Sequence, residues 1–192
     1  MNIAVYSGSF NPLHIGHLAI IRHLIEEAGF DCVYLIVSPK NPLKDGISSD
    51  SGQERYEAAI AAVNRHFGTP SADGVAKVKV DDIELNMPEP HYTIRTLDAL
   101  AEREPGNSFT LTVGADNLAD IRRWRDYRRI LKDYGIAVFP RTGFDMESIQ
   151  SDLLSEDPSY RIILLNAEMV DISSTEIRNA LEDGKDVSEY LM

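Results

Sequence analysis

The sequence predicts an α/β fold, with a single doubly wound domain built on a parallel sheet over residues 1–192. Apolar runs such as 2–6 and 32–37 are short and lack polar alternation, as strands do when both faces of a parallel sheet are covered. Between these two runs, residues 15–28 carry apolar side chains at helical spacing. A chain of 192 residues is long enough to bury one sizeable core.

The remaining elements follow from the same patterns in chain order. The predicted strands are residues 2–6, 32–37, 77–80, 108–113, 134–141 and 161–165. The predicted helices are residues 15–28, 52–66, 93–101 and 145–155, with a last helix that begins at Ser173 and Ser174. Thr93 is the expected N-cap of the helix that follows it.

The charge balance excludes some classes of partner. With 31 acidic and 19 basic residues the formal net charge is −12, which argues against a nucleic acid or an anionic membrane surface as the partner. An anionic nucleotide would therefore need a local basic pocket. Cys32 is the only cysteine, so an internal disulfide is excluded and a reducing compartment is expected. We see no signal peptide and no apolar run near the ~20 residues that cross a bilayer, so we expect a cytoplasmic protein.

Residues 8–17 join the first strand to the first helix and carry the strongest chemical signal. Turn-forming residues break the apolar run, and the helix is expected to start near Leu13. His14 and His17 are three apart, which places both imidazoles on one face of the first turn, with Gly16 between them. Helix N-termini attract phosphate, and imidazoles can donate hydrogen bonds to it and add charge when protonated. The pattern therefore predicts a site that binds phosphate.

Other functions were weighed for the same residues. Two histidines three apart can be metal ligands, but one cysteine and no nearby acidic residue at ligand spacing argue against zinc. The chain has neither a G-x-G-x-x-G after the first strand nor a G-x-x-x-x-G-K-[ST], which argues against a dinucleotide-binding dehydrogenase and a P-loop NTPase. We interpret His23, His66 and His91 as surface or core-edge residues.

Polar residues also follow later strands, at the edge where open α/β sheets bind ligands. Lys40 and Lys44 lie in a basic loop after the second strand, and either could contact phosphate or simply be solvated. Asp116 follows strand 108–113 after Gly114, and it could accept from ribose hydroxyls or form an ordinary Asx turn.

Near the end of the chain Ser173, Ser174 and Glu176 form a capping pattern that also offers donors to an anion, with Arg178 on the same side. A capping box alone is common.

A cluster of arginines surrounds the only tryptophan, Trp124, and forms the one basic patch of the sequence. It suits an anionic ligand, whereas the alternative is an exposed helix with salt bridges. The cluster consists of Arg122, Arg123, Arg125, Arg128 and Arg129. Arg55 lies near a helix start, which is unfavourable for a cation. It could have a ligand-binding or structural role, or it could be a plain surface residue.

The segment G-S-F-N-P-L-H-I-G-H at 8–17 resembles the H-x-G-H signature of the nucleotidyltransferase superfamily, and its surroundings resemble the bacterial nicotinate-nucleotide adenylyltransferases. The string I-S-S-T-E-I-R at 172–178 is specific to that superfamily, and the G-A-D-N at 114–117 and its spacing to Trp124 match the family. The resemblance runs from residue 3 to about 191. Asn11 departs from it, since many members have Asp there.

The resemblance implies a Rossmann-like fold and a reaction in which AMP passes from ATP to nicotinate mononucleotide, giving deamido-NAD and pyrophosphate in NAD biosynthesis. It implies catalytic roles for His14, His17, Lys44 and Arg178. The implied ATP-binding residues are Gly8, Ser9, Phe10, His14, His17, Lys44, Gly114, Asp116, Ile172, Ser173, Ser174 and Arg178. The implied residues for the mononucleotide are Tyr92, Thr93, Asn117, Trp124 and Arg141.

Mg²⁺ is the expected cofactor, held mainly by the ATP phosphates and water, with no metal ligand assigned to the chain. No nucleophile stands beside a base, so no covalent intermediate is expected. Nicotinamide mononucleotide as the preferred acceptor, and a nucleotide-binding module without turnover, are the alternatives. A homo-oligomer is left open. If the histidine pair and the Ser173–Ser174 cap lay on separate faces, the enzyme assignment would collapse.

Overall fold

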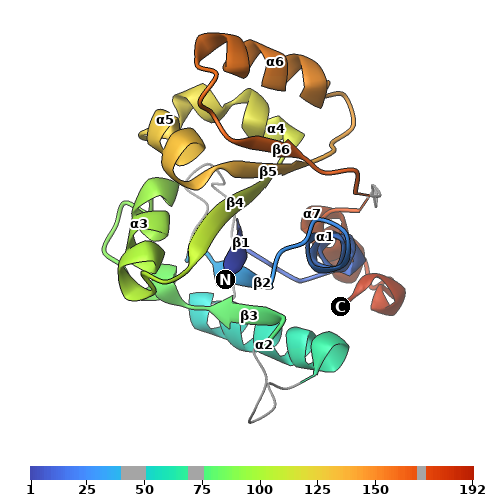
Figure 1. Cartoon of the computed structure of the whole chain (residues 1–192). Helices are drawn as coiled ribbons and strands as arrows, with labels where there is room; N and C mark the ends of the chain where they lie inside the picture. The colour runs from blue at the N-terminus through green and yellow to red at the C-terminus, as the bar shows by residue number, and fades with distance from the viewer. Residues whose placement is uncertain (40–50, 69–75, 168–171) are drawn as a thin grey trace.

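The computed structural model describes residues 1–39, 51–68, 76–167 and 172–192. Six strands form one sheet in the order β3-β2-β1-β4-β5-β6, and each neighbouring pair is parallel (Figure 1). The strands are β1 (Asn2–Gly8), β2 (Cys32–Val37), β3 (Val78–Asp81), β4 (Ser108–Gly114), β5 (Ile136–Phe139) and β6 (Ile162–Leu164). This confirms the predicted doubly wound α/β fold. The strand order reverses between β1 and β4, and ligands bind such sheets at the carboxyl ends of the strands beside that point.

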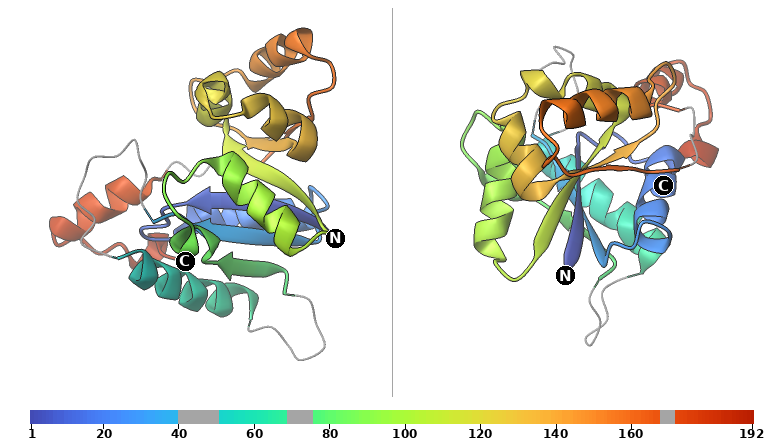
Figure 2. Two further views of the ribbon diagram at one scale, coloured as in Figure 1. Left: turned by 90° about the vertical axis from the view of Figure 1, so that its left-hand side faces the viewer. Right: turned by 45° about the horizontal axis from the view of Figure 1, so that its top comes forward.

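Helices cover both faces of the sheet (Figure 1, Figure 2). They are α1 (Ile15–Glu26), α2 (Gly52–Phe67), α3 (Thr93–Arg103), α4 (Ala115–Ala119), α5 (Tyr127–Arg129), α6 (Met146–Glu156) and α7 (Ser174–Glu182). Short 3₁₀ turns form η1 (Ile83–Asn86), η2 (Ile121–Arg123) and η4 (Ser188–Tyr190), and η3 (Ile130–Tyr134) is a π turn. None of the helices in the described part of the chain is long and apolar enough to cross a membrane.

The two faces of β1 bury side chains in two separate cores. Ala4 and Tyr6 lie in a cluster with apolar residues of α1 and α2, whereas Ile3 and Val5 lie in a cluster with residues of α3, η3 and α6. Burial on both sides explains why β1 and β2 are continuously apolar in sequence, because neither face meets water.

Three local predictions were wrong by a few residues. The strand predicted over 134–141 ends at Phe139, so Arg141 lies beyond it, and the segment 115–119 is a short helix rather than a turn. Thr93 is the first residue of α3 and Tyr92 is its N-cap. Each difference lies at the end of an element, where local sequence patterns locate the boundary only to within a few residues.

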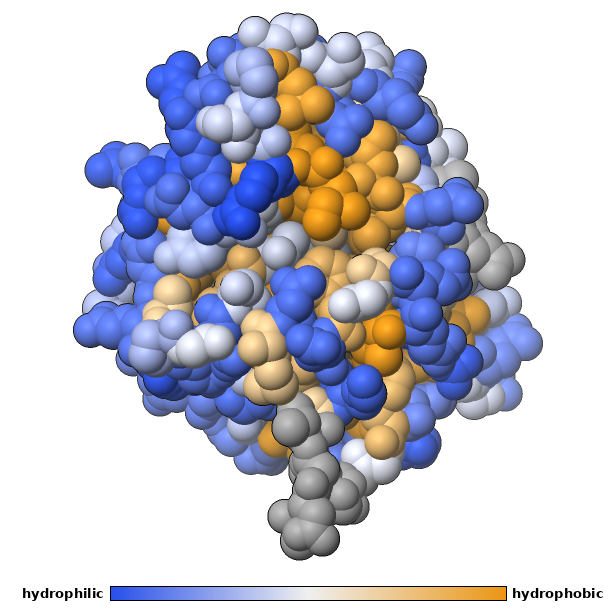
Figure 3. Space-filling model, in the orientation of Figure 1, coloured by the Kyte–Doolittle hydropathy of each residue, from blue (hydrophilic) through white to orange (hydrophobic). Residues whose placement is uncertain are grey.

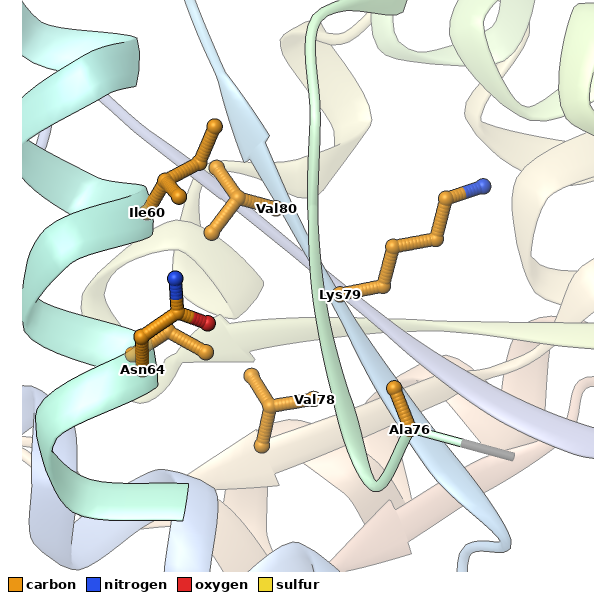
Figure 4. A pocket seen from close by; sticks show the side chains of 7 residues that line it. Ile60, Asn64, Ala76, Val78, Lys79 and Val80 are labelled. Carbon is orange, nitrogen blue, oxygen red and sulfur yellow. The ribbon is translucent and has the colours of Figure 1, made fainter. Parts of the chain in front are cut away.

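Two apolar surfaces lie away from the motifs. Figure 3 shows apolar surface over β6, the edge strand, where Ile163 is 48% exposed. A hollow of about 220 Å³ lies between α2 and β3 (Figure 4). None of the predicted site residues lines this hollow; its lining residues are Ile60, Val63, Asn64, Ala76, Val78, Lys79 and Val80.

Candidate active site

The turn after β1 holds the first part of the site. Phe10 has φ of +44°, a conformation that is costly for a residue with a side chain, and its ring is buried. That ring packs edge-on against Tyr6 and His17, with ring centroids 5.5 and 5.3 Å away. The buried ring anchors the turn, so the backbone of Gly8 and Ser9 is held at the carboxyl end of β1.

His14 is the N-cap of α1 and its backbone is extended, so the helix begins two residues later than the predicted start near Leu13. Its backbone N–H donates to Nδ1 of His17 at 3.1 Å, and the two rings have centroids 3.8 Å apart. Because Nδ1 of His17 accepts a hydrogen bond, the neutral ring carries its proton on Nε2. A Cβ at Gly16 would lie 3.0 Å from Nδ1 of His14, so glycine is the residue that lets this ring fold back over the helix end.

Both imidazoles are neutral near pH 7. Burial lowers the pKa of His17 well below its ordinary value, and His14 and Arg141 lower it further. Burial and Arg141 lower the pKa of His14 to about 4, while Glu176 opposes the shift. At neutral pH the two imidazoles can therefore donate hydrogen bonds but carry no charge, and they would add charge only when protonated.

The N-terminal end of α7 lies against the turn that carries His14 and His17, and together they form what we call the phosphate corner. Ser173 is its N-cap, and Glu176 accepts from the backbone N–H of Ser173 at 2.8 Å, which completes a capping box. Ser174 lies in the first turn, and its Oγ donates to the carbonyl of Pro12 at 3.1 Å. Arg178 donates to the carbonyl of Asn11 at 2.7 Å. Two motifs separated by about 160 residues in the sequence are thus hydrogen-bonded to each other.

Ile172 completes this contact, since a Cβ at Gly16 would lie 3.6 Å from its Cγ2. The histidine pair and the capped end of α7 share one corner, and the arrangement that would have overturned the enzyme assignment does not occur. Ser173 is exposed, and its backbone N–H and its hydroxyl both donate to Glu176, whereas Arg178 is half-buried.

The carboxyl ends of β4 and β5 bring Gly114, Asp116 and Arg141 together. A Cβ at Gly114 would lie 3.0 Å from Nε of Arg141, and that nitrogen lies 3.8 Å from Oδ1 of Asp116. The guanidinium of Arg141 also stands over the ring of Phe139, 4.9 Å from its centroid. Its charge acts on both imidazoles, so these strand ends border the histidine corner. Asn117 is exposed in α4.

The predicted mononucleotide residues lie on a neighbouring part of the surface. Tyr92 is 43% exposed and precedes α3, and the guanidinium of Arg125 lies 6.0 Å from the centroid of its ring. Trp124 ends η2, is half-buried and packs against the core on the α3 side of the sheet. Part of its ring is therefore a core contact, as the simpler interpretation of a lone tryptophan suggests.

The arginine cluster around Trp124 is largely neutralised by carboxylates. Arg122 and Arg128 both contact Glu156, and Arg129 contacts Asp98 and Asp133. Arg123 and Arg125 each lie within 4 Å of a neighbouring aspartate, at 3.8 and 3.5 Å. These ion pairs agree with the alternative of an exposed helix with salt bridges, although the segment is divided into η2 and α5. Asp98 of α3 and Glu156 of α6 are tertiary partners, whereas the other carboxylates lie within four residues of the arginines that they contact.

Lys40, Lys44 and the rest of their loop lie outside the described residues. Sequence reasoning left the role of one further residue open and missed another. Arg55 is 5% exposed and donates to the carbonyls of Ser9, Ser38 and Pro39, so its role is structural. The buried carboxylate of Glu84 accepts from two hydroxyls. The sequence signals for Arg55 were its unfavourable place at a helix start and the resemblance to a family that also has an arginine there.

Within the described part of the chain, no three His, Cys, Asp or Glu side chains are grouped so that they could hold a metal ion.

Comparison with known proteins points to one family. The cytidylyltransferase-like family model matches residues 5–180. A probable nicotinate-nucleotide adenylyltransferase of Flavobacterium johnsoniae is 36% identical over 191 residues, covering 100% of this chain and 92% of that protein. Its counterpart in Bacteroides fragilis is 35% identical, covering 97% of this chain and 85% of that protein.

A solved structure of Plasmodium falciparum nicotinic acid mononucleotide adenylyltransferase complexed with NaAD has the same fold. It matches with a TM-score of 0.76 at 22% identity, covering 99% of this chain and 90% of that one. At this identity the match bears on the fold alone.

Proposed function

The chain belongs to the nicotinate-nucleotide adenylyltransferase family of enzymes, and we propose that it transfers AMP from ATP to nicotinate mononucleotide, giving deamido-NAD and pyrophosphate. The observation that carries this proposal is the joining of two helix ends, α1 and α7, beside the strand-order reversal between β1 and β4. Helix N-termini present unpaired N–H groups and partial positive charge, so two of them in one corner suit a polyphosphate.

A phosphate oxygen of the mononucleotide attacks the α-phosphorus of ATP in line. A new P–O bond forms, the bond from the α-phosphorus to the bridging oxygen breaks, and pyrophosphate leaves with the electron pair. Catalysis needs positioning and stabilisation of charge on the phosphates, without a protein nucleophile. The neutral Nε2–H of His17 and the guanidinium of Arg178 are suited to that charge, one as a fixed dipole and the other as a cation.

We assign the ATP site to Gly8, Ser9, Phe10, His14, His17, Gly114, Asp116, Ile172, Ser173, Ser174 and Arg178, with Lys44 from the loop outside the described residues. Gly114 suits the role because a side chain there would crowd Arg141. Tyr92, Thr93, Asn117, Trp124 and Arg141 are assigned to the mononucleotide. The fork of Arg141 suits a carboxylate or a phosphate, and we propose nicotinate as the acceptor because its ring carboxylate, unlike the amide of nicotinamide, can accept both hydrogen bonds of that fork.

Nucleotidyl transfer from ATP commonly uses a divalent metal, and we propose Mg²⁺. The polar groups of the corner are imidazole, hydroxyl, backbone N–H and guanidinium groups, with the carboxylates of Asp116 and Glu176 nearby. Such a set fits an ion whose ligands come mainly from phosphate oxygens and water, which Mg²⁺ prefers. When bound, the ion neutralises phosphate charge.

Pyrophosphate release tests the proposal. The chain is mixed with ATP and Mg²⁺, and with nicotinate or nicotinamide mononucleotide in separate reactions. We expect release to depend on the mononucleotide and to be faster with the nicotinate form. Faster release with nicotinamide mononucleotide would reverse the acceptor assignment. Nucleotide binding without release in either mixture would make the chain a binding module.

A further inference from the structure

A buried carboxylate lies behind the site, between the phosphate corner and α3. Glu84 in η1 is 5% exposed. Its Oε2 accepts from Oγ of Ser38 at 2.7 Å, and its Oε1 accepts from Oγ1 of Thr96 at 2.8 Å. Ser38 follows β2, whereas Thr96 is a buried residue in the first turn of α3. One side chain thus joins two elements that are distant in the sequence.

The hydrogen bonds continue to β1 with a defined direction. Oγ of Ser7 lies 3.1 Å from Oγ of Ser38. The single hydroxyl proton of Ser38 is donated to Glu84, so Ser7 must donate to Ser38. A continuous chain of hydroxyls therefore runs from Ser7, the residue before Gly8, through Ser38 to the carboxylate, which Thr96 approaches from the other side.

A buried carboxylate is expensive for folding, and apolar residues of similar volume would commonly fill such a space at lower cost. Arg55, also buried, holds the backbone of the same segment by donating to the carbonyls of Ser9 and Ser38. Two buried charged side chains thus make hydrogen bonds to residues that follow β1 and β2. Both therefore hold the turn that carries the phosphate corner in place.

We propose that Glu84 is a positioning residue, which fixes the first turn of α3, with Tyr92 and Thr93, relative to the phosphate corner. This inference rests on the proposed function, in which the attacking phosphate of the mononucleotide must reach the α-phosphorus of ATP. The position of α3 relative to the phosphate corner matters for that reason.

Thr96 provides the sharpest test, since its hydroxyl can be removed with little change of volume. Thr96→Val deletes the donor to Glu84, and Thr96→Ser keeps it. Steady-state pyrophosphate release is measured while each substrate is varied in turn, and melting temperatures are recorded. We expect Thr96→Val to raise the KM for the mononucleotide about tenfold, the value of a lost hydrogen bond to a charged group. The KM for ATP should stay within about twofold, and Thr96→Ser should restore the wild-type KM.

Glu84→Gln extends the test to the other end of the chain of hydroxyls. The amide can accept through one oxygen only and must donate to the other hydroxyl, which has to reverse its direction, so both KM values should rise. Glu104→Gln is the matched control, because Glu104 accepts from Oη of Tyr34 at 2.8 Å and from Nδ2 of Asn107 at 2.8 Å at the far end of α3. It should lower the melting temperature without changing either KM.

The outcomes separate this inference from the proposed function. If the wild-type chain releases no pyrophosphate, the proposed function is wrong, and the positioning role of Glu84 is wrong with it. An active wild type whose mononucleotide KM is the same in Thr96→Val, or is raised equally in Thr96→Ser and Glu104→Gln, overturns the positioning role alone. If Glu84→Gln does not fold, the threonine pair still decides.

Discussion

The two helix ends that form the corner differ in burial and in charge. His14 and His17 at α1 are enclosed by Tyr6, Phe10 and each other, and both are neutral. Ser173 at the start of α7 is exposed, and Arg178 brings a permanent cation. Desolvation makes the α1 end a set of fixed dipoles, while the α7 end carries the charge of Arg178, because a guanidinium stays protonated.

This difference suggests that the two helix ends have different roles in the reaction. Fixed donors in a dry setting stabilise charge that develops during reaction, because they need no reorganisation. An accessible cation attracts an anion from solution and contributes mostly to binding. The α1 end should therefore affect turnover, and the α7 end should affect the KM for ATP more than turnover.

Removing the ring of His17 should have the largest effect. We expect His17→Ala to lower kcat about 100-fold or more, as the loss of one oxyanion donor does, with little effect on the KM for ATP. His17→Gln, whose amide nitrogen can stand near the Nε2 position, should retain part of the activity. Single-turnover pyrophosphate release measures both, with circular dichroism to confirm folding. Near-unchanged turnover in His17→Ala would remove this residue from the mechanism.

Changes at Arg178 should act mainly on binding. Arg178→Ala is expected to raise the KM for ATP about tenfold, and Arg178→Lys to raise it less, because the charge remains but the fork is lost. Lys185→Ala is the control, since Lys185 is an exposed cation just after α7 that pairs with Asp183 at 3.0 Å. Equal KM values in Arg178→Ala and Lys185→Ala would mean that the α7 end does not bind the triphosphate.

The neutral state of His14 makes a pH prediction. Its pKa is lowered to about 4 in the folded chain, so between pH 6.5 and 4 the unfolded chain binds a proton that the folded chain does not. The stability due to the neutral ring is present above pH 6.5 and is lost as the pH falls toward 4. We expect His14→Gln to reduce the loss of unfolding free energy between pH 7 and 4.5 by about 1 kcal/mol in urea titrations. An unchanged pH slope would show that the pKa of the ring is the same in the folded and the unfolded chain.

Changes in the arginine cluster should have the smallest effect, because its arginines already pair with carboxylates. Arg128 is exposed and pairs with Glu156 at 3.3 Å. Such pairs contribute about 0–1 kcal/mol, so Arg128→Ala should change the KM for the mononucleotide less than about twofold. A tenfold rise in that KM would restore the interpretation of the cluster as a binding patch and make the corner only part of the site.

Much of the fold and corner could be predicted because the signals are local. The apolar run of β1, the break at Gly8 and the spacing of His14 and His17 lie within a few residues of one another. The capping box of Ser173 and Glu176 likewise spans four residues. The roles of Arg55 and Glu84 could not be predicted this way, since their partners come from β1, β2 and α3.

By itself the sequence determined which segments become strands and helices and which helix ends carry anion-binding groups, because periodicity and capping are properties of neighbouring residues. Tertiary structure alone decided the charge state of the histidines, the neutralisation of the arginines and the hydrogen bonds from Ser174 and Arg178 to the β1 turn. Those properties depend on water exclusion and on charges brought close by folding, and neither can be read from a linear order of residues.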